Sequence, residues 1–397
     1  MARAAGLLGR DGTPVPTVFA RMTALAGSTG SINLGQGYPD ADGPHEVLES
    51  AVRAIRTGHN QYAPGPGIPE LRHAVADHVA RHRGMSFDPD TEVLVTTGAT
   101  EAIAAAVLAL TNPGDEVLVL EPFYDSYAAV IALAGAVRRT VRLRPPDESS
   151  PRWHLDPDEL RAAVSPSTRL ILLNTPHNPT GAVLTRSELE VIAGAALAND
   201  TLVVTDEVYE HLVYDDAEHI PIATLPGMAE RTLTISSAGK TFSVTGWKIG
   251  WACGPAPLVD ATLAVKQFLT YTSGAPLQPA VALALGLDDS VAELRRSLQD
   301  RRDALCAGLK AAGFDLVVPE ATYFVVADAA PLGATDAVSF CRDLPRRARV
   351  VAIPVSAFTS PGGEAAAALK SQVRFAFCRS AGDIATACER LAGADWT

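Results

Sequence analysis

The stretch SSAGKTFSVTGWKIGW, residues 236–251, places Lys240 and Lys248 eight positions apart among small and apolar residues. Burying an unpaired ammonium ion is costly, and lysine is rarely found buried without a partner. Either this segment is a surface loop, or an anionic group and an electrophile lie beside it. The rest of the chain decides between these two interpretations.

Length and composition set the broad class of the protein. The chain has 397 residues, which is long for one hydrophobic core and favours two domains. Hydrophobic residues make up 47% and charged residues 20%, as in globular rather than disordered chains. The net charge of −12 argues against a nucleic-acid partner or an anionic membrane surface, but not against small anionic ligands.

The cysteines and the first residues indicate the compartment. The five cysteines show neither a CxxC nor a histidine-paired spacing, so neither a disulfide framework nor a zinc site is indicated. The start, MARAAGLLGRDGTPVPT, is broken by Arg10 and Asp11 and does not resemble a signal peptide. No apolar run reaches the roughly 18 residues of a membrane-spanning helix. We expect a cytoplasmic protein without a metal in its site.

The chain alternates apolar strands with helical stretches from about residue 92. EVLVTTG, DEVLVLEP, RLILLNTP, TLVVTDEVY, TLTISSAG and KIGWACG read as strands. Near-continuous apolar strands between helices predict an α/β fold whose mostly parallel sheet is buried on both faces. After about residue 276 the strands FDLVVPE, TYFVVADA, RVVAIPVSAF and SQVRFAFC predict a smaller α/β domain. We expect an N-terminal arm (1–30), a large domain (46–284) and a small domain (31–45 and 285–397).

Polar residues follow several of these strands, at the carboxyl ends where parallel sheets bind ligands. Asp206, at the end of TLVVTD, is either a helix N-cap or the carboxylate partner of a buried cation. Tyr209 follows three residues later, which on a helical turn places it on the same side. Asn178, in the turn NTPHNPTG, would bring an amide to the same edge.

The segment TTGATEA, residues 96–102, ends a strand and opens a helix. Gly98 and Ala99 permit close backbone approach, and the N–H groups of a helix N-terminus can bind an anion. A glycine turn of this kind is as often structural as functional. If the anion is a phosphate, its ligands would be Ala99, Thr100, Ser237 and Lys248.

Lys240 would then be a covalent anchor for an aldehyde. A lysine that forms a Schiff base needs a lowered pKa, and desolvation beside a second cation supplies it. An aldehyde, a phosphate and a ring nitrogen kept protonated by Asp206 together describe pyridoxal 5′-phosphate. Tyr209 and Asn178 would hydrogen-bond the ring oxygen, and Tyr124, in EPFYDSY, would stack on the ring.

The order TGA, EPFY, NPTG, TDEVY, SSAGK and TGWK resembles that of the class I/II aminotransferases of fold type I, over nearly the whole chain. NLGQGYPD and ATYFVVAD resemble the kynurenine–oxoglutarate transaminase / cysteine-S-conjugate β-lyase group. GATEAIAAAVLAL and EPFYDSY resemble the actinobacterial N-succinyldiaminopimelate aminotransferases. The resemblance implies a seven-stranded sheet, pyridoxal phosphate and a role in amino-acid biosynthesis.

The resemblance also implies roles for further residues. Arg374, in VRFAFC, would grip the substrate α-carboxylate, since a guanidinium forms two parallel hydrogen bonds to a carboxylate. Gly37, Asn178 and Phe19 would face the substrate, with Phe19 where the transaminase group often has tryptophan. Tyr62 would reach the cofactor phosphate of a neighbouring subunit, which implies a homodimer with shared active sites.

The expected reaction is a ping-pong transfer of an amino group from an L-amino acid to a 2-oxo acid such as 2-oxoglutarate, with Lys240, Asp206 and Tyr209 as catalytic residues. N-succinyl-LL-diaminopimelate is the favoured donor. The alternatives are a kynurenine- or glutamine-type transaminase, a cysteine-S-conjugate β-lyase and a synthase or epimerising branch. A pyridoxal-binding transcription regulator is disfavoured, since only about 30 residues precede INLGQG and the chain is acidic.

Overall fold

The computed structural model describes residues 7–148 and 150–396. Its largest element is an eight-stranded sheet in the order β2-β9-β8-β7-β6-β3-β4-β5. The strands, in sheet order, are Val93–Thr97, Ile249–Cys253, Thr232–Ser237, Leu202–Asp206, Thr168–Asn174, Glu116–Glu121, Val137–Arg144 and His154–Leu155.

The strand directions agree with the predicted mostly parallel sheet. Strands β8, β7, β6, β3 and β4 run parallel to one another, whereas β9 pairs antiparallel with both β2 and β8. The two-residue strand β5 adds an antiparallel edge to the seven expected strands. Central strands such as β8 are buried along their whole length because helices cover both faces of the sheet.

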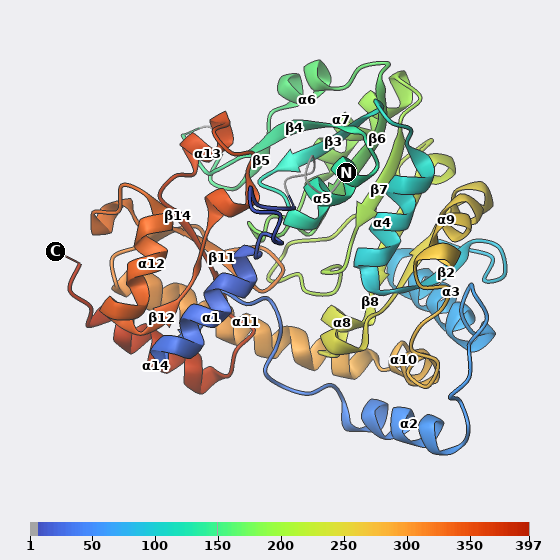
Figure 1. The fold of residues 1–397 in the computed structure, drawn as a ribbon, viewed down its shortest axis with the longest axis horizontal. Coiled ribbons are helices and arrows are strands. Elements are labelled where there is room, and N and C mark those ends of the chain that lie inside the picture. The colour runs from blue at the N-terminus through green and yellow to red at the C-terminus, as the bar shows by residue number, and fades with distance from the viewer. Residues whose placement is uncertain (1–6, 149, 397) are drawn as a thin grey trace.

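Helices pack on the two faces of this sheet (Figure 1). One face is covered by α4 (Gly98–Leu110), α5 (Asp125–Leu133) and α9 (Ala256–Leu269), whose alanines and leucines form one core with the strands. The other face is covered by α6 (Pro157–Ala163) and α7 (Arg186–Ala198). A third core lies between the β2–β9 edge and α2 (His45–Arg56), α3 (Pro69–Arg83) and α10 (Gln278–Ala284).

A second sheet forms in the C-terminal part, where the sequence predicts a smaller α/β unit. It is antiparallel with the order β10-β11-β14-β13. The strands are Asp315–Leu316, Phe324–Asp328, Gln372–Ala376 and Ile353–Pro354. Helices α1 (Val18–Thr29), α11 (Asp288–Ala311), α12 (Ala337–Ala348) and α14 (Ala381–Ala392) pack around it in one hydrophobic core.

The first and last parts of the chain lie side by side. Strand β1 (Ile32–Asn33) pairs in parallel with β12 (Val350–Val351), and α1 contacts α12 (Figure 1). This pairing supports grouping residues 31–45 with the C-terminal elements, although the domain boundaries stay predictions. The first six residues of the predicted arm lie outside the described residues.

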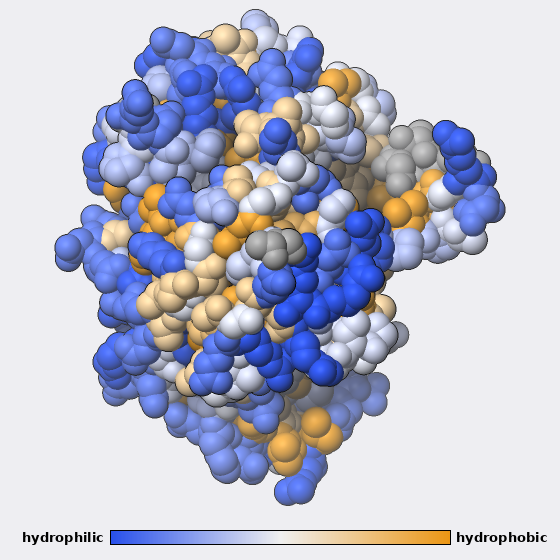
Figure 2. Space-filling model, turned by 90° about the vertical axis from the view of Figure 1, so that its left-hand side faces the viewer, coloured by the Kyte–Doolittle hydropathy of each residue, from blue (hydrophilic) through white to orange (hydrophobic). Residues whose placement is uncertain are grey.

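Short helices complete the fold. They are α8 (Ala238–Thr241), α13 (Glu364–Ala368) and the 3₁₀ segments Ile222–Thr224, Ala229–Arg231, Thr245–Trp247, Ala330–Leu332 and Val355–Phe358. Within residues 7–148 and 150–396, no helix is both long enough and apolar enough to cross a bilayer. On the face over the C-terminal elements, hydrophilic residues prevail and hydrophobic ones form small separate groups (Figure 2).

Candidate active site

A cavity of about 370 Å³ opens where the carboxyl ends of the large sheet meet the second sheet. The side chains and backbone that sequence reasoning singled out converge on it from segments that are far apart in the chain. All of the predicted site residues except Tyr62 line it: Phe19, Gly37, Gly98, Ala99, Thr100, Tyr124, Asn178, Asp206, Tyr209, Ser237, Lys240, Lys248 and Arg374.

The register of the sheet explains this convergence. Asn174 and Asp206 are paired residues at the ends of β6 and β7, and Ser237 ends β8. Because parallel strands end at the same edge, residues far apart in the chain lie next to one another there. The Asn174 amide also donates to the Asp206 backbone carbonyl at 2.8 Å, which joins the two strand ends beyond the ladder.

Asp206 is a buried carboxylate that accepts hydrogen bonds from two groups. Its Oδ2 accepts a hydrogen bond of 2.6 Å from the Tyr127 hydroxyl, and its Oδ1 accepts a longer one from the Val208 backbone. Burial raises the pKa of Asp206 from 3.8 to about 6, while the Tyr127 hydrogen bond and the nearby Lys240 oppose that rise. The hydrogen bond from Val208 is long, so capping the turn after β7 is a minor role of Asp206. Its carboxylate mainly serves the cavity that it lines.

Lys240 lies on the short helix α8, and its charge and that of Asp206 influence each other. Its Nζ donates to the Gly37 carbonyl at 3.1 Å and lies 5.5 Å from the centre of the Tyr323 ring. Burial, with smaller contributions from the positive charges of Lys248 and Arg374, lowers the pKa of Lys240 to about 8. An amine with this pKa has a far larger unprotonated fraction at neutral pH than an ordinary lysine, and in that form it can act as a nucleophile or base.

Lys248 and the first turn of α4 form the anion-binding end of the cavity. Helix α4 begins at Gly98, and the Lys248 Nζ donates to the Thr100 hydroxyl at 3.3 Å. Gly98 has a φ of +68°, and a Cβ there would lie 3.1 Å from the Lys248 Nζ. A Cβ on Gly250 would lie 2.6 Å from the Gly98 carbonyl carbon. The absence of a side chain at Gly250 therefore allows β9 to approach the start of α4.

Arg374, on β14, is fully buried and lines the same cavity. Its guanidinium donates to the Asn178 Oδ1 and to the Gly35 carbonyl, each at 2.9 Å. It lies 4.0 Å from the centre of the Phe324 ring and 5.5 Å from that of Phe19. Burial lowers the pKa of Arg374 to about 10, yet the group stays charged at neutral pH.

Aromatic rings close the cavity. The rings of Phe19 and Tyr124 lie 6.4 Å apart, and Tyr209 packs edge-to-face with Tyr323 at 5.3 Å. Burial raises the pKa of Tyr124 to about 12 and that of Tyr209 further, so both hydroxyls are protonated donors at neutral pH. Tyr209 follows β7 in a turn rather than in a helix, but its ring still faces the cavity.

Two predicted residues sit differently from the others. Tyr62 is 84% exposed and outside the cavity, with its ring edge-to-face against Tyr271 at 5.7 Å. Gly37 lines the cavity, but its carbonyl already accepts hydrogen bonds from Lys240 and the Tyr323 hydroxyl. A Cβ on Gly37 would lie 2.7 Å from Phe324, which is why the position suits glycine.

Sequence reasoning missed several cavity residues. Tyr127 is the most important, because it donates directly to Asp206. Its signal was present in the quoted segment EPFYDSY, where Tyr124 and Tyr127 are spaced by one helical turn. The other missed lining residues include Gln36, Tyr38, Asn174 and Phe324. They lie within the quoted segments NLGQGYPD, NTPHNPTG and ATYFVVAD, but the motifs did not single them out.

The charges around the cavity indicate its ligands. The titratable cations among the described lining residues are Lys240, Lys248 and Arg374, and the carboxylate among them is Asp206. Side chains that are buried with an excess of positive charge are stabilised by an anion. Lys248 contacts the first turn of α4, whereas Arg374 contacts Asn178 and Gly35, so the two cations could each face a different anionic group. The donor set therefore fits a ligand pair with a phosphate at Lys248 and a carboxylate at Arg374.

Comparison with known proteins assigns this geometry to a family. Residues 29–391 match the aminotransferases of class I and II. The chain belongs to this family. Members of this family use pyridoxal phosphate. The aminotransferase has the α/β fold of type I that its relatives share.

Individual relatives of the aminotransferase are similar over nearly its whole length. A probable N-succinyldiaminopimelate aminotransferase of Mycobacterium tuberculosis is 56% identical over 380 residues, covering 94% of this chain and 95% of that protein. A solved structure of the N-succinyldiaminopimelate aminotransferase from that organism superposes with a TM-score of 0.92 at 55% identity, covering 95% of this chain and 97% of that one.

Relatives with other names are also similar to the aminotransferase. Kynurenine–oxoglutarate transaminase 3 of Mus musculus is 42% identical, covering 86% of this chain and 80% of that protein. A methionine aminotransferase of Escherichia coli is 36% identical, covering 94% of this chain and 95% of that protein. The reaction class is therefore shared by relatives whose names differ in the amino donor.

Proposed function

We propose that this aminotransferase binds pyridoxal 5′-phosphate with Lys240 as its covalent anchor and transfers an amino group from an L-amino acid to a 2-oxo acid such as 2-oxoglutarate by a ping-pong reaction. The observation that carries the proposal is the charge arrangement of the cavity. A buried amine of lowered pKa lines the cavity together with one carboxylate, Asp206, and the two cations Lys248 and Arg374.

The residues present fit this cofactor. The first turn of α4, Ser237 and Lys248 would hold the phosphate, because helix N–H groups, a hydroxyl and an ammonium are all donors to an anion. Asp206 would pair with the protonated ring nitrogen. Tyr209 and the Asn178 amide would donate to the ring oxygen, and Tyr124 would stack on the ring. The Asn178 Oδ1 is occupied by Arg374, so its Nδ2 is left to donate.

Bound pyridoxal phosphate supplies an electron-withdrawing ring that accepts the electron pair released when the substrate Cα–H bond breaks. The protein's residues hold the substrate and move the proton. Arg374 would orient the α-carboxylate with a guanidinium that is held in place by Asn178 and Gly35. Lys240 Nζ would take the proton from Cα, a role that suits a general base whose pKa is about 8. Phe19 and Tyr124 would exclude water from this step.

For the donor, we favour N-succinyl-LL-diaminopimelate. The support is the 56% identity to the mycobacterial relative that bears this name, compared with 42% to the mouse kynurenine transaminase. A kynurenine- or glutamine-type transaminase or a cysteine-S-conjugate β-lyase is the second candidate, because all of these reactions use the same anchor lysine and carboxylate clamp. The mouse relative supports this second candidate.

A homodimer belongs to the same proposal. Tyr62 and Phe268 are 84% and 85% exposed, and Tyr271 lies against Tyr62. Burying these exposed aromatic rings against a second copy would remove apolar surface from water. Tyr62 would then reach the phosphate site of the partner. Sedimentation of the protein with and without Tyr62→Ala tests this proposal, and a monomeric wild-type protein would contradict it.

Replacing Lys240 by alanine tests the anchor. The purified variant is expected to lack the visible absorbance of covalently bound pyridoxal phosphate and to lose transamination by several orders of magnitude. Lys310, which lies on α11 outside the cavity, offers a control, and Lys310→Ala should keep both properties. A Lys240→Ala protein with normal turnover would refute the proposal.

A comparison of donors tests the substrate. We expect N-succinyl-LL-diaminopimelate to give a higher kcat/KM than kynurenine, glutamine or methionine, with 2-oxoglutarate as acceptor. A preference for kynurenine would overturn the substrate assignment but leave the reaction class in place. Release of pyruvate from a cysteine conjugate without any 2-oxo acid would instead favour the β-lyase.

A further inference from the structure

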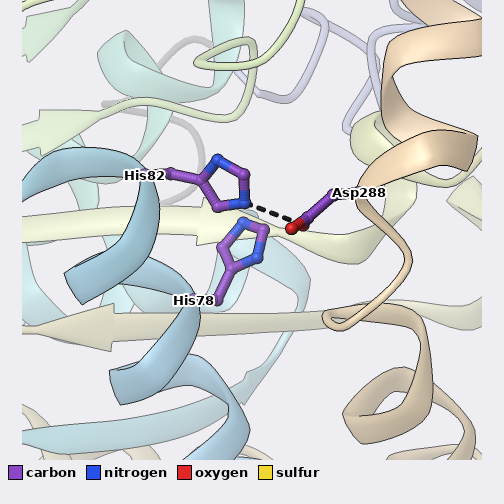
Figure 3. Close-up of side chains that lie close together, drawn as sticks. All are labelled: His78, His82 and Asp288. Atoms are coloured by element: carbon purple, nitrogen blue, oxygen red, sulfur yellow. Dashed lines mark hydrogen bonds and ion pairs between the residues drawn. The ribbon is translucent and has the colours of Figure 1, made fainter.

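Two helices that are far apart in the sequence bring a second group of chemically active side chains together, away from the active-site cavity. His78 and His82 lie on α3, and Asp288 is the first residue of α11 (Figure 3). One nitrogen or oxygen atom from each lies within 4.8 Å of the others. Imidazole and carboxylate groups at such distances are the ligands that divalent transition metals prefer.

The spacing on α3 explains why the two histidines meet. Positions four apart lie on the same face of a helix, and the rings of His78 and His82 are 4.4 Å apart. The His82 Nε2 lies 2.9 Å from the Asp288 Oδ1 (Figure 3). Two ligand atoms on a tetrahedral zinc ion lie about 3.3 Å apart, so a metal would need only a small movement of these side chains.

His78 is oriented as a metal ligand by its other nitrogen. Its Nδ1 lies 3.0 Å from the Leu285 carbonyl, which can only accept, so the Nδ1 carries the hydrogen. The Nε2 of the neutral ring then presents a lone pair. Histidines that bind metals commonly donate the other ring nitrogen to a carbonyl or carboxylate in this way.

His211 contacts the same lone pair. Its Nε2 lies 2.8 Å from the His78 Nε2, a separation at which one of the two nitrogens must carry a hydrogen. His211 is therefore the donor in this pair, and a metal at His78 would replace that hydrogen bond. The nearby charges are Arg81, 3.7 Å from Asp288, and the ion pair of Arg83 with Glu210 at 3.0 Å.

The group is open to solvent on one side. His82, His211 and Asp288 line a second cavity of about 510 Å³, and the side chain of Asp288 is 53% exposed. An ion can therefore enter without unfolding of α3. The opposite side of the group is anchored to the fold, because His78 is buried.

We propose that His78, His82 and Asp288 form a binding site for a divalent transition-metal ion such as Zn²⁺, with solvent completing the coordination. The ion fastens α3 to the start of α11. The site is connected to the active site through the chain, since His211, which contacts His78, lies two residues after Tyr209. Glu210 accepts a 2.7 Å hydrogen bond from Ser236, which precedes the cavity residue Ser237. The cysteine pattern did not reveal this site because its ligands are histidines and an aspartate.

Titration of the chelator-treated holoenzyme with Zn²⁺, followed by calorimetry, tests the proposal, and Co²⁺ absorption reports the ligand set. The wild-type protein is expected to bind one equivalent that is lost in two conservative variants, His82→Gln and Asp288→Asn. Loss of one ligand should weaken binding at least about a hundredfold, since even changes beyond the ligands cost ten- to a hundredfold. Arg81→Gln should tighten binding, because it removes a positive charge beside Asp288.

His73→Gln is the matched control, because His73 is an exposed histidine on the same helix and outside the group. This variant should bind Zn²⁺ as the wild-type protein does. The proposal would be overturned if the wild-type protein bound no Zn²⁺. It would also be overturned if His82→Gln, Asp288→Asn, Arg81→Gln and His73→Gln all bound Zn²⁺ equally well. The measurement does not depend on transamination, and Lys240→Ala protein should bind the ion unchanged.

Discussion

Replacing Asp206 by asparagine should stabilise the cofactor-free protein while it inactivates the enzyme. Burial raises the pKa of this carboxyl from 3.8 to about 6. Each pKa unit corresponds to about 1.4 kcal/mol, so ionised Asp206 costs the folded, cofactor-free protein about 3 kcal/mol above pH 6. Asparagine has nearly the same shape, its oxygen can accept the Tyr127 hydrogen bond, and it carries no charge.

The pH dependence gives the sign of this effect. The folded-state pKa lies above the unfolded-state value, so the cost is absent below about pH 4, grows as the pH rises and is complete above about pH 6. The stabilisation of Asp206→Asn over the wild-type protein should therefore be about 3 kcal/mol at pH 8 and about half of that at pH 5.

Urea unfolding of cofactor-stripped wild-type and variant proteins at these two pH values measures the difference. The same variant, reconstituted with pyridoxal phosphate, should lose transamination activity by two or more orders of magnitude, because no carboxylate faces the ring nitrogen. Equal or lower stability of the variant at pH 8, or a difference that does not change with pH, would refute the reasoning.

Further predictions concern the neighbours of Asp206 and the two anion sites. Tyr127→Phe removes a hydrogen bond that lowers the pKa of Asp206, so the acid limb of the pH–rate profile should move to higher pH; an unmoved limb would contradict this role. Arg374→Lys cannot form two parallel hydrogen bonds to the substrate carboxylate. It should lower kcat/KM for amino donors about a hundredfold in steady-state kinetics, which corresponds to about 2.7 kcal/mol of lost transition-state stabilisation. Gly98→Ala should weaken cofactor binding by displacing Lys248, as measured by fluorescence titration of the stripped protein. Gly84 has a similar φ of +66°, but a Cβ there would meet no atom within 4 Å. Gly84→Ala therefore serves as a control that should not change cofactor affinity.

The pattern of residues along the chain was enough to predict the layers of the fold. Apolar runs such as TLVVTD and RLILLN are buried on both faces of the sheet. The period and the length of such a run are local features, so they predict a buried strand without knowledge of the rest of the chain. The polar motifs after these strands were sufficient to predict which residues would lie close together, because parallel strands end at the same edge of the sheet. The short antiparallel strand β5 has no such signal, since two residues carry no period.

Only the tertiary structure decided how those residues interact. The Tyr127 hydrogen bond to Asp206 spans 79 positions, and the Arg374 bond to Asn178 spans 196. Burial, which sets the pKa values of Asp206 and Lys240, depends on atoms from many segments at once. The contact between α3 and the start of α11 that brings His82 to Asp288 likewise follows from packing, because no local pattern relates residues 206 positions apart.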